Sequence, residues 1–139
     1  MELLVLQRIV ALLKADAAVS ALVGTKIYDR PPHENGEPAV ASPYISLGPH
    51  DGLTEDSDDC MDLMELTFQV DAWSWGDGVA YSRSEVSNIA AAVRSCLHRQ
   101  EITITGAAVE IQHQMTRVMR DPDGETNHAA ITFVASIDG

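Results

Sequence analysis

The densest group of potential metal ligands in this sequence is a run of acidic side chains near its middle. Five carboxylates fall within eight positions, at Glu55, Asp56, Asp58, Asp59 and Asp62. Oxygen ligands of this kind bind Ca²⁺ or Mg²⁺, but an EF-hand loop needs a glycine at its sixth position, and no glycine interrupts this run. A block of like charges normally stays extended in solvent. We therefore expect a mobile acidic loop without bound metal, and docking against a basic partner stays open as its role.

Histidine and cysteine do not offer a better metal site. The five histidines are scattered along the chain: His33, His50, His98, His113 and His128. None of them forms an HxH or HxxxH pair. The two cysteines, Cys60 and Cys96, have neither zinc-ligand nor CxxC spacing, so we interpret them as reduced thiols of an intracellular protein. We expect no metal and no cofactor.

Signatures of the common catalytic sites are also missing. No serine lies in a GxSxG motif, and the chain has no GxGxxG motif or P-loop. His113 falls on the apolar phase of a predicted strand, where a hydrogen-bonded core histidine is more frequent than a ligand or a base. We expect that the protein is not an enzyme, and we assign no catalytic residue.

Trp73 and Trp75 stand at the end of a predicted strand. Such a pair can stack on a ligand, but aromatic side chains on the outer face of a strand more often anchor a loop or a neighbouring subunit. Leu63 and Val134 are apolar residues that fall on the same outer phase. We therefore predict that Leu63, Trp73, Trp75 and Val134 contribute to a subunit interface.

The element that should organise the fold is a strand followed by a helix in residues 62–98. Apolar residues first alternate with polar ones, which is typical of a strand buried on one face: Met64, Leu66, Phe68, Val70 and Ala72. After a turn in which Asp77 is expected to cap the helix, apolar residues recur at helical spacing: Val86, Ile89, Ala90, Val93 and Leu97. This stripe predicts a helix on the apolar face of the sheet.

The other segments complete an α+β pattern. Helical periodicity opens the chain, and a second short helix follows, with Asp16 as its cap and Gly24 at its end. Residues 26–29 and 43–48 predict short strands, separated by a proline-rich loop at 30–38 without regular structure. The strand at 43–48 is bounded by breakers and leads into GPHDG at 48–52. A short strand is expected at 102–105, and a hairpin at 109–116 and 131–137, with a bulge or bend at 117–120. We predict one domain over residues 1–139, with a mainly antiparallel sheet and helices packed on one face.

Charge limits the possible partners. The chain has 9 basic and 21 acidic residues, a net charge of −12, which argues against a surface that binds nucleic acid tightly. The apolar N-terminal segment carries Glu2, Arg8 and Lys14 and has no cleavage site, so we interpret it as neither a signal peptide nor a membrane span.

Several segments, in their order along the chain, resemble the tail-completion or tail-terminator proteins of long-tailed phages, prophages and gene transfer agents. They are LVGTKIY at 22–28, the proline-rich segment after it, PYISLG at 43–48, VDAWS at 70–74 and the helix that follows. Together they cover almost the whole chain. The acidic run at 55–62 is an addition that this pattern does not contain.

The resemblance implies a structural protein in the tail of a virion or phage-like particle, assembled in the cytoplasm of the bacterial host. It implies a homo-oligomeric ring, of six subunits in the relatives, that caps the tail tube and joins it to the head. The tail tube protein and the head–tail connector proteins would be its partners. DNA would pass through without specific binding, and no membrane would be involved.

A ring around DNA should avoid basic side chains in its channel, because Lys and Arg bind phosphates by counterion release. Glu65 and Asp71 on the long strand and Glu110 on the hairpin are therefore the candidate lumen residues. An acidic inhibitor or DNA mimic, binding a basic partner through residues 55–62, is the alternative function. An enzyme or small-ligand binder would need an apolar pocket with converging titratable groups.

Overall fold

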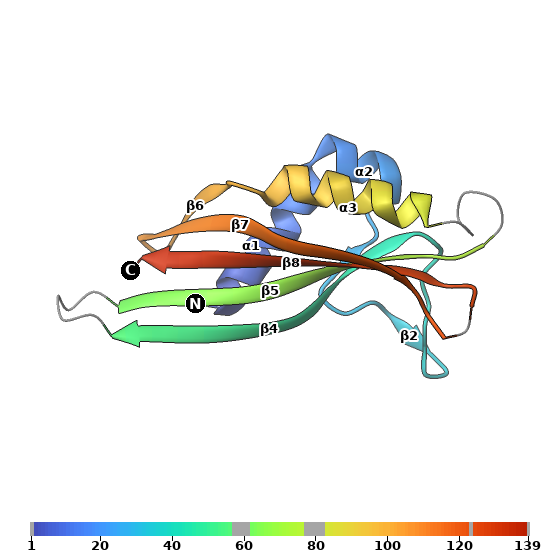
Figure 1. Ribbon diagram of the computed structural model, residues 1–139, viewed down its shortest axis with the longest axis horizontal. Coiled ribbons are helices and arrows are strands. Elements are labelled where there is room, and N and C mark those ends of the chain that lie inside the picture. Colours follow the sequence, from blue (N-terminus) through green and yellow to red (C-terminus); the bar gives the residue numbers. More distant parts are fainter. Residues whose placement is uncertain (1, 57–61, 77–82, 123, 139) are drawn as a thin grey trace.

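The computed structural model describes residues 2–56, 62–76, 83–122 and 124–138. Its helices are α1 (Glu2–Ala15), α2 (Ala17–Val23) and α3 (Ser84–Leu97). Its strands are β1 (Ile27–Tyr28), β2 (His33–Glu34), β3 (Glu37–Pro38), β4 (Tyr44–Asp56), β5 (Asp62–Ser74), β6 (Glu101–Ile104), β7 (Ala107–Arg120) and β8 (Asn127–Asp138). The arrangement is shown in Figure 1.

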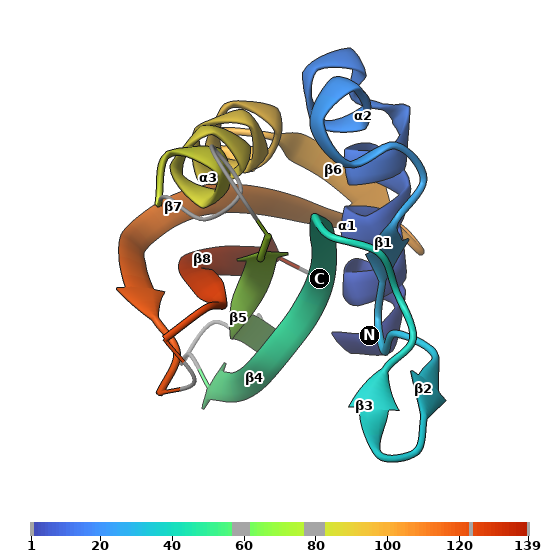
Figure 2. The ribbon, with the colours of Figure 1, turned by 90° about the vertical axis from the view of Figure 1, so that its right-hand side faces the viewer.

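Six strands form one strongly curled sheet, in the order β1-β4-β5-β8-β7-β6. Only β1 pairs in parallel, with β4, and the other neighbours are antiparallel. Seen end-on in Figure 2, the long strands curve below α3, while α1 runs beside β1. The predicted α+β class with a mainly antiparallel sheet is confirmed, and the sheet is mixed through its β1 edge.

The core forms where the apolar phases of strands and helices meet. On β5 the buried side chains include Leu66, Phe68 and Val70, and on β8 they alternate in the same way. The register places Phe68 opposite Phe133, and their rings stack with centroids 5.4 Å apart. The apolar stripe of α3 is buried in the same cluster. The prediction that this helix packs on the apolar face of the sheet is therefore confirmed. We call this side of the sheet the core face.

The helices contact the sheet at different places. Helix α3 contacts β5, β7 and β8, whereas α1 reaches the sheet at its β1 edge and also contacts α2 and α3. That all helices pack on one face therefore stays a prediction. Asp16 caps α2 as expected, because its Oδ2 accepts a hydrogen bond from the Val19 backbone N–H at 3.0 Å. Asp77, the expected cap of the next helix, lies outside the described residues, and α3 begins at Ser84.

Strand β4 differs most from the sequence prediction. It was expected to end at residue 48 but continues through residues 48–52, because a register shift between Leu47 and His50 accommodates Pro49 as a β-bulge. Strand β4 therefore extends into the acidic run, and the backbones of Glu55 and Asp56 pair with β5. The expected loop is correspondingly shorter. Asp58 and Asp59 lie outside the described residues.

Two further expectations were wrong. Residues 30–38 do contain regular structure, since β2 and β3 form a two-stranded hairpin. Asn35 and Gly36 connect these strands with φ values of 54° and 80°, which suits a tight hairpin turn. In β7 the irregularity lies between His113 and Met115 rather than at 117–120, and it leaves Met115 52% exposed instead of buried.

Candidate interaction site

Polar and aromatic side chains gather on the side of the sheet opposite the core face. We call it the second face and define it by Gln69, Asp71 and Trp73, which alternate with the buried residues of β5. The register brings Tyr44 of β4 and His128 of β8 to either side of Trp73. The site therefore combines segments from three strands that are far apart in sequence.

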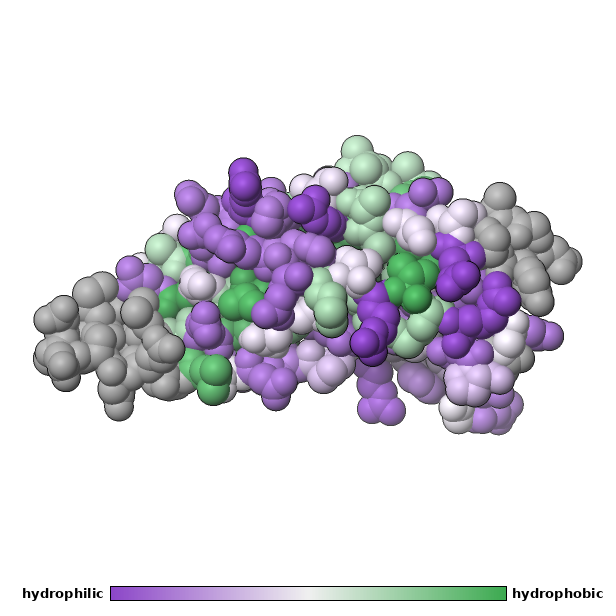
Figure 3. Space-filling model, viewed as in Figure 1, coloured by the Kyte–Doolittle hydropathy of each residue, from purple (hydrophilic) through white to green (hydrophobic). Residues whose placement is uncertain are grey.

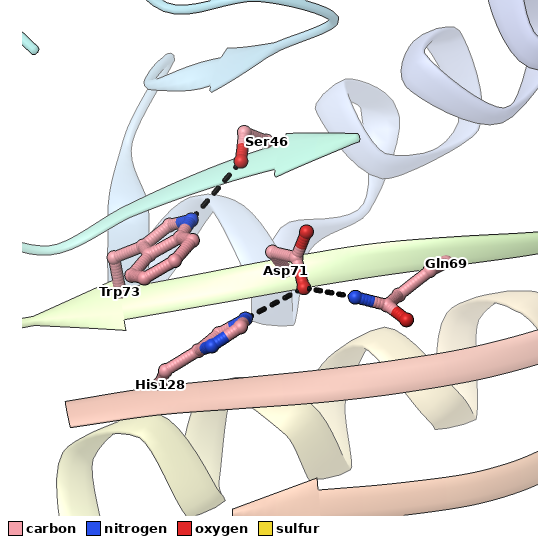
Figure 4. A network of polar contacts seen from close by, with 5 residues as sticks. All are labelled: Ser46, Gln69, Asp71, Trp73 and His128. Carbon is pink, nitrogen blue, oxygen red and sulfur yellow. Dashed lines mark hydrogen bonds and ion pairs between the residues drawn. The ribbon is translucent and has the colours of Figure 1, made fainter. Parts of the chain in front are cut away.

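Asp71 is the centre of a hydrogen-bond network on this face (Figure 4). Its Oδ1 accepts from Nε2 of His128 at 2.7 Å and from Nε2 of Gln69 at 2.8 Å. The carboxylate is buried, with 6% of the residue exposed. A carboxylate withdrawn from water needs such donors, and either the neutral Nε2–H tautomer or the protonated imidazole supplies one.

The same network holds Trp73 in place. Its indole stacks on the His128 ring, with centroids 3.9 Å apart and planes 9° apart, and its Nε1 donates to Ser46 Oγ at 3.0 Å. Trp73 is therefore fixed both through its ring and through its only hydrogen-bond donor.

Strand β4 approaches Asp71 closely at Gly48. A Cβ atom at this position would lie 2.5 Å from Oδ2 of Asp71 and 3.1 Å from Nε2 of Gln69. These separations are shorter than ordinary van der Waals contact, so the packing of β4 over the carboxylate requires glycine here.

Tyr44, Trp73 and Trp75 form an aromatic wall at the end of the network. The Tyr44 ring stacks on Trp73 with centroids 6.4 Å apart and meets the edge of Trp75 at 5.8 Å and 77°. The backbone N–H of Trp75 donates to Ser42 Oγ at 2.9 Å, which ties this segment to the start of β4. The three rings are packed against one another at the end of the sheet.

These rings line an open pocket of about 660 Å³. The other residues that line it come from the β2–β3 hairpin, from β4 and from the β7–β8 turn: Pro31, His33, Glu37, Pro38, Ser46, Asp121 and Thr126. Of the described residues that line it, two carry carboxylates and none is Lys or Arg. The pKa of Tyr44 is raised, first by burial and then by the negative charges of Asp71 and Asp121. The pocket is therefore aromatic and electronegative.

The structure brings together only part of the predicted interface set. Trp73 and Trp75 are half-buried neighbours in the pocket, whereas Val134 is half-buried farther along the second face, opposite Thr67. The Leu63 backbone belongs to β5, and its side chain is outside the described part of the structure. The role of these residues as a subunit interface stays a prediction.

The predicted lumen residues differ in burial. Glu65 and Glu110 are exposed, and both lie opposite Ser136 of β8, so they occupy neighbouring positions on the sheet. Asp71, by contrast, is buried in its network. Tyr44 and His128 were not predicted as site residues, because only the strand register places them beside Trp73.

The remaining titratable groups do not form a second site. Among the described residues, no group of three His, Cys, Asp or Glu side chains could hold a metal ion. His113 is half-buried, and its Nε2 lies 2.7 Å from Thr116 Oγ1, while Arg94 Nε donates to its Nδ1 at 3.3 Å. Cys96 is a buried free thiol. No helix in the described part of the chain is long and apolar enough to cross a membrane.

Comparisons with known proteins identify the family. The family model described as "Tail completion protein gp17" matches residues 7–138. A chain of the solved structure described as "Virion of native gene transfer agent (GTA) particle" is similar, with a TM-score of 0.77 and 26% sequence identity, over 94% of this chain and 92% of that chain. A comparison with curated protein sequences gives no match. The resemblance predicted from the sequence is therefore confirmed, and the chain belongs to the tail completion protein gp17 family.

Proposed function

We propose that this chain is a structural protein in the tail of a phage or phage-like particle, and that copies of it form a ring that caps the tail tube and joins it to the head. The observation that carries the proposal is the family match over residues 7–138. The similarity to a chain of a gene transfer agent virion, which spans nearly all of both chains, supports it. Both likenesses extend over the whole subunit rather than over one motif.

The sheet supports the proposal because it has two different open edges. Strand β1 pairs only with residues 45 and 46 of β4, and β6 pairs only with residues 107–110 of β7. The Ile111 backbone of β7 also bonds to residues 99 and 100, and the His113 N–H donates to Nδ1 of His98. Within the described chain, the outer side is therefore unpaired after Ser46 in β4 and after His113 in β7. A ring needs a head-to-tail contact between two different patches of one subunit, and unpaired strand edges are suited to such contacts.

Each open edge also carries an exposed large apolar side chain. Leu53 of β4 is 63% exposed, and Met115 of β7 is 52% exposed. On the face shown in Figure 3, hydrophobic residues form small areas interspersed with hydrophilic ones rather than one continuous surface. We therefore place the subunit contact along these edges, with Leu53 and Met115 as apolar anchors.

Assembly can be tested at these anchors. The wild-type chain should give a ring-sized species by size-exclusion chromatography with light scattering, and Leu53→Ser or Met115→Ser should shift it toward monomer. Leu22→Ser is the matched control, because Leu22 is 39% exposed but lies on α2. Equal effects of all three changes would contradict the edge contact. A wild-type monomer that binds a basic protein tightly would favour the acidic inhibitor or DNA mimic.

The place of the ring in the particle needs a separate test. In cells that produce the particles, removal of this chain should leave DNA-filled heads and tail tubes that are not joined, as seen by electron microscopy. Complete tailed particles in its absence would contradict a role in head–tail joining.

The lumen proposal concerns charge. We propose that Glu65 and Glu110 face the DNA channel, since both are exposed and lie on either side of Ser136 of β8. The double change Glu65→Lys and Glu110→Lys should leave assembly intact, give the ring salt-sensitive affinity for DNA and lower DNA delivery. Asp29→Lys is a control at another exposed site. A double variant that assembles, binds no DNA at low salt and delivers normally would assign the acidic charge to solubility or docking instead.

A further inference from the structure

We propose that the pocket between the aromatic wall and the β2–β3 hairpin receives an arginine side chain of a basic partner protein. The aromatic wall consists of Tyr44, Trp73 and Trp75, and the hairpin contributes Glu37 to the lining. This inference concerns the single subunit and does not depend on ring formation.

The shape and the rings suit a guanidinium group. This group is planar and weakly hydrated, and it stacks on the faces of Trp and Tyr, where the ring quadrupole attracts a cation. Trp75 stands at 77° to Tyr44, while Trp73 lies within 21° of the Tyr44 plane, so the wall presents rings in two orientations. A pocket of about 660 Å³ also has room for the residues that flank the arginine.

In the part of the chain that the structure describes, no Lys or Arg side chain forms an ion pair with the carboxylates of this pocket. Its two acidic side chains, Glu37 and Asp121, come from the hairpin and from the β7–β8 turn. Among the described residues, ion pairs join only His50 to Glu2 and His128 to Asp71. Glu37 and Asp121 therefore have no Lys or Arg partner in that part of the chain. A cation in this pocket would be attracted by the negative charge and by the rings that line it.

The wall is already ordered before a partner binds. Trp73 is held by Ser46 and by the stacked His128, which Asp71 fixes in turn, and the Trp75 backbone is held by Ser42. A preorganised site loses less side-chain entropy on binding than a mobile one does. The buried network of Asp71 thus acts as a support for the binding surface.

Charge also favours a different protein over a second copy as the source of the arginine. Each copy carries a net charge of −12, with 9 basic against 21 acidic residues, so two copies repel each other at long range. A basic protein is attracted by the same field, which speeds its association. We therefore assign the pocket to a basic segment of another protein.

The two tryptophans of the chain both line this pocket, so their indole N–H signals report directly on its occupancy. The experiment titrates the ¹⁵N-labelled chain with a short peptide that contains two arginines among glycines and serines. Both indole signals should shift saturably. The same peptide with lysines should bind about threefold more weakly, and the uncharged citrulline version about tenfold more weakly. Indole signals that do not move, or equal binding of the citrulline peptide, would overturn the proposal.

Matched variants distinguish binding in the pocket from non-specific attraction of the peptide by the negative charge of the whole chain. The double change Glu37→Gln and Asp121→Asn should weaken arginine-peptide binding about fivefold to tenfold. The control Glu65→Gln and Glu110→Gln also removes two negative charges, but Glu65 lies eight positions from Trp73 on β5, roughly 26 Å at about 3.3 Å per residue. It should change the affinity by less than about twofold. Equal losses in the two double variants would show non-specific attraction and overturn the proposal.

Discussion

Replacing Gly48 with alanine should destabilise the protein through Asp71 rather than through the strand itself. The new Cβ atom would lie 2.5 Å from Oδ2 of Asp71, whereas ordinary contacts begin at 3.4 Å. Asp71 cannot move away freely, because it is 6% exposed and accepts hydrogen bonds from His128 and Gln69. Either these bonds lengthen or the backbone of β4 shifts away from β5.

The expected cost follows from these bonds. A hydrogen bond to a charged group contributes about 1.5 to 3 kcal/mol, and the clash should weaken one or both of the bonds to Asp71. Alanine partly offsets this loss, because it reduces the conformational entropy of the unfolded chain. This effect stabilises the folded protein by about 0.4 to 1 kcal/mol relative to glycine. We expect Gly48→Ala to lower the free energy of unfolding by about 1 to 3 kcal/mol.

Urea unfolding of a double-mutant cycle tests the mechanism. In an Asp71→Ala background the carboxylate is gone, so Gly48→Ala should be nearly neutral there, with a coupling energy of at least about 1 kcal/mol. The control is Gly52→Ala on the same strand. A Cβ there would meet the carboxylate of Glu2, whose side chain is 42% exposed and can move aside, so the change should stay within about 0.5 kcal/mol. An equal cost of Gly48→Ala in both backgrounds would refute the reasoning.

Three other predictions concern the core and its titratable groups. Phe68→Ala should lower the free energy of unfolding by about 3 to 5 kcal/mol, because the ring is 1% exposed, and an unchanged denaturation midpoint would contradict this. Burial raises the pKa of Cys96 to about 11, so in a Cys60→Ser variant the thiol should react with iodoacetamide much more slowly than glutathione does at pH 8. The free energy of unfolding should also fall as the pH rises from 9 to 11, since the Cys96 thiol ionises at a lower pH in the unfolded chain than in the folded protein. The pKa of His113 is lowered by burial and by the charge of Arg94. The free energy of unfolding should therefore fall as the pH drops below 6.5, because the unfolded imidazole takes up its proton first. An NMR titration midpoint of His113 above 6.5 would contradict this expectation.

The elements that could be predicted are those whose burial is one-sided along their whole length. In β5 and β8 every second residue is buried in the core, and in α3 one stripe of residues is buried. The spacing of apolar residues in the sequence therefore indicates the buried face directly. The cap of α2 was also predictable, because Asp16 acts on a backbone N–H only three residues away.

Strands β4 and β7 could not be predicted to their full length, because each contains an irregularity that depends on its neighbour. Gly48, Pro49 and Gly52 favour a turn locally, but pairing with β5 on both sides of the bulge keeps the chain extended. In β7 the shift after His113 turns Met115 toward solvent, although its sequence phase predicts burial. Local pattern does not reveal a change of phase that the partner strand imposes.

The sequence by itself determined the fold class and the family, because one-sided strands and helices, and the order of short segments along the chain, are local properties of the residues. It also indicated Trp73 and Trp75 as exposed-phase aromatics. Only the tertiary structure decided that Asp71 is a buried support and not a free surface charge, since its partner His128 is 57 residues away and reaches it through the β5–β8 register. In the same way, the pairing of β4 with β5 placed Tyr44 beside Trp73, and the proline-rich hairpin contributes to the lining of the pocket beside them.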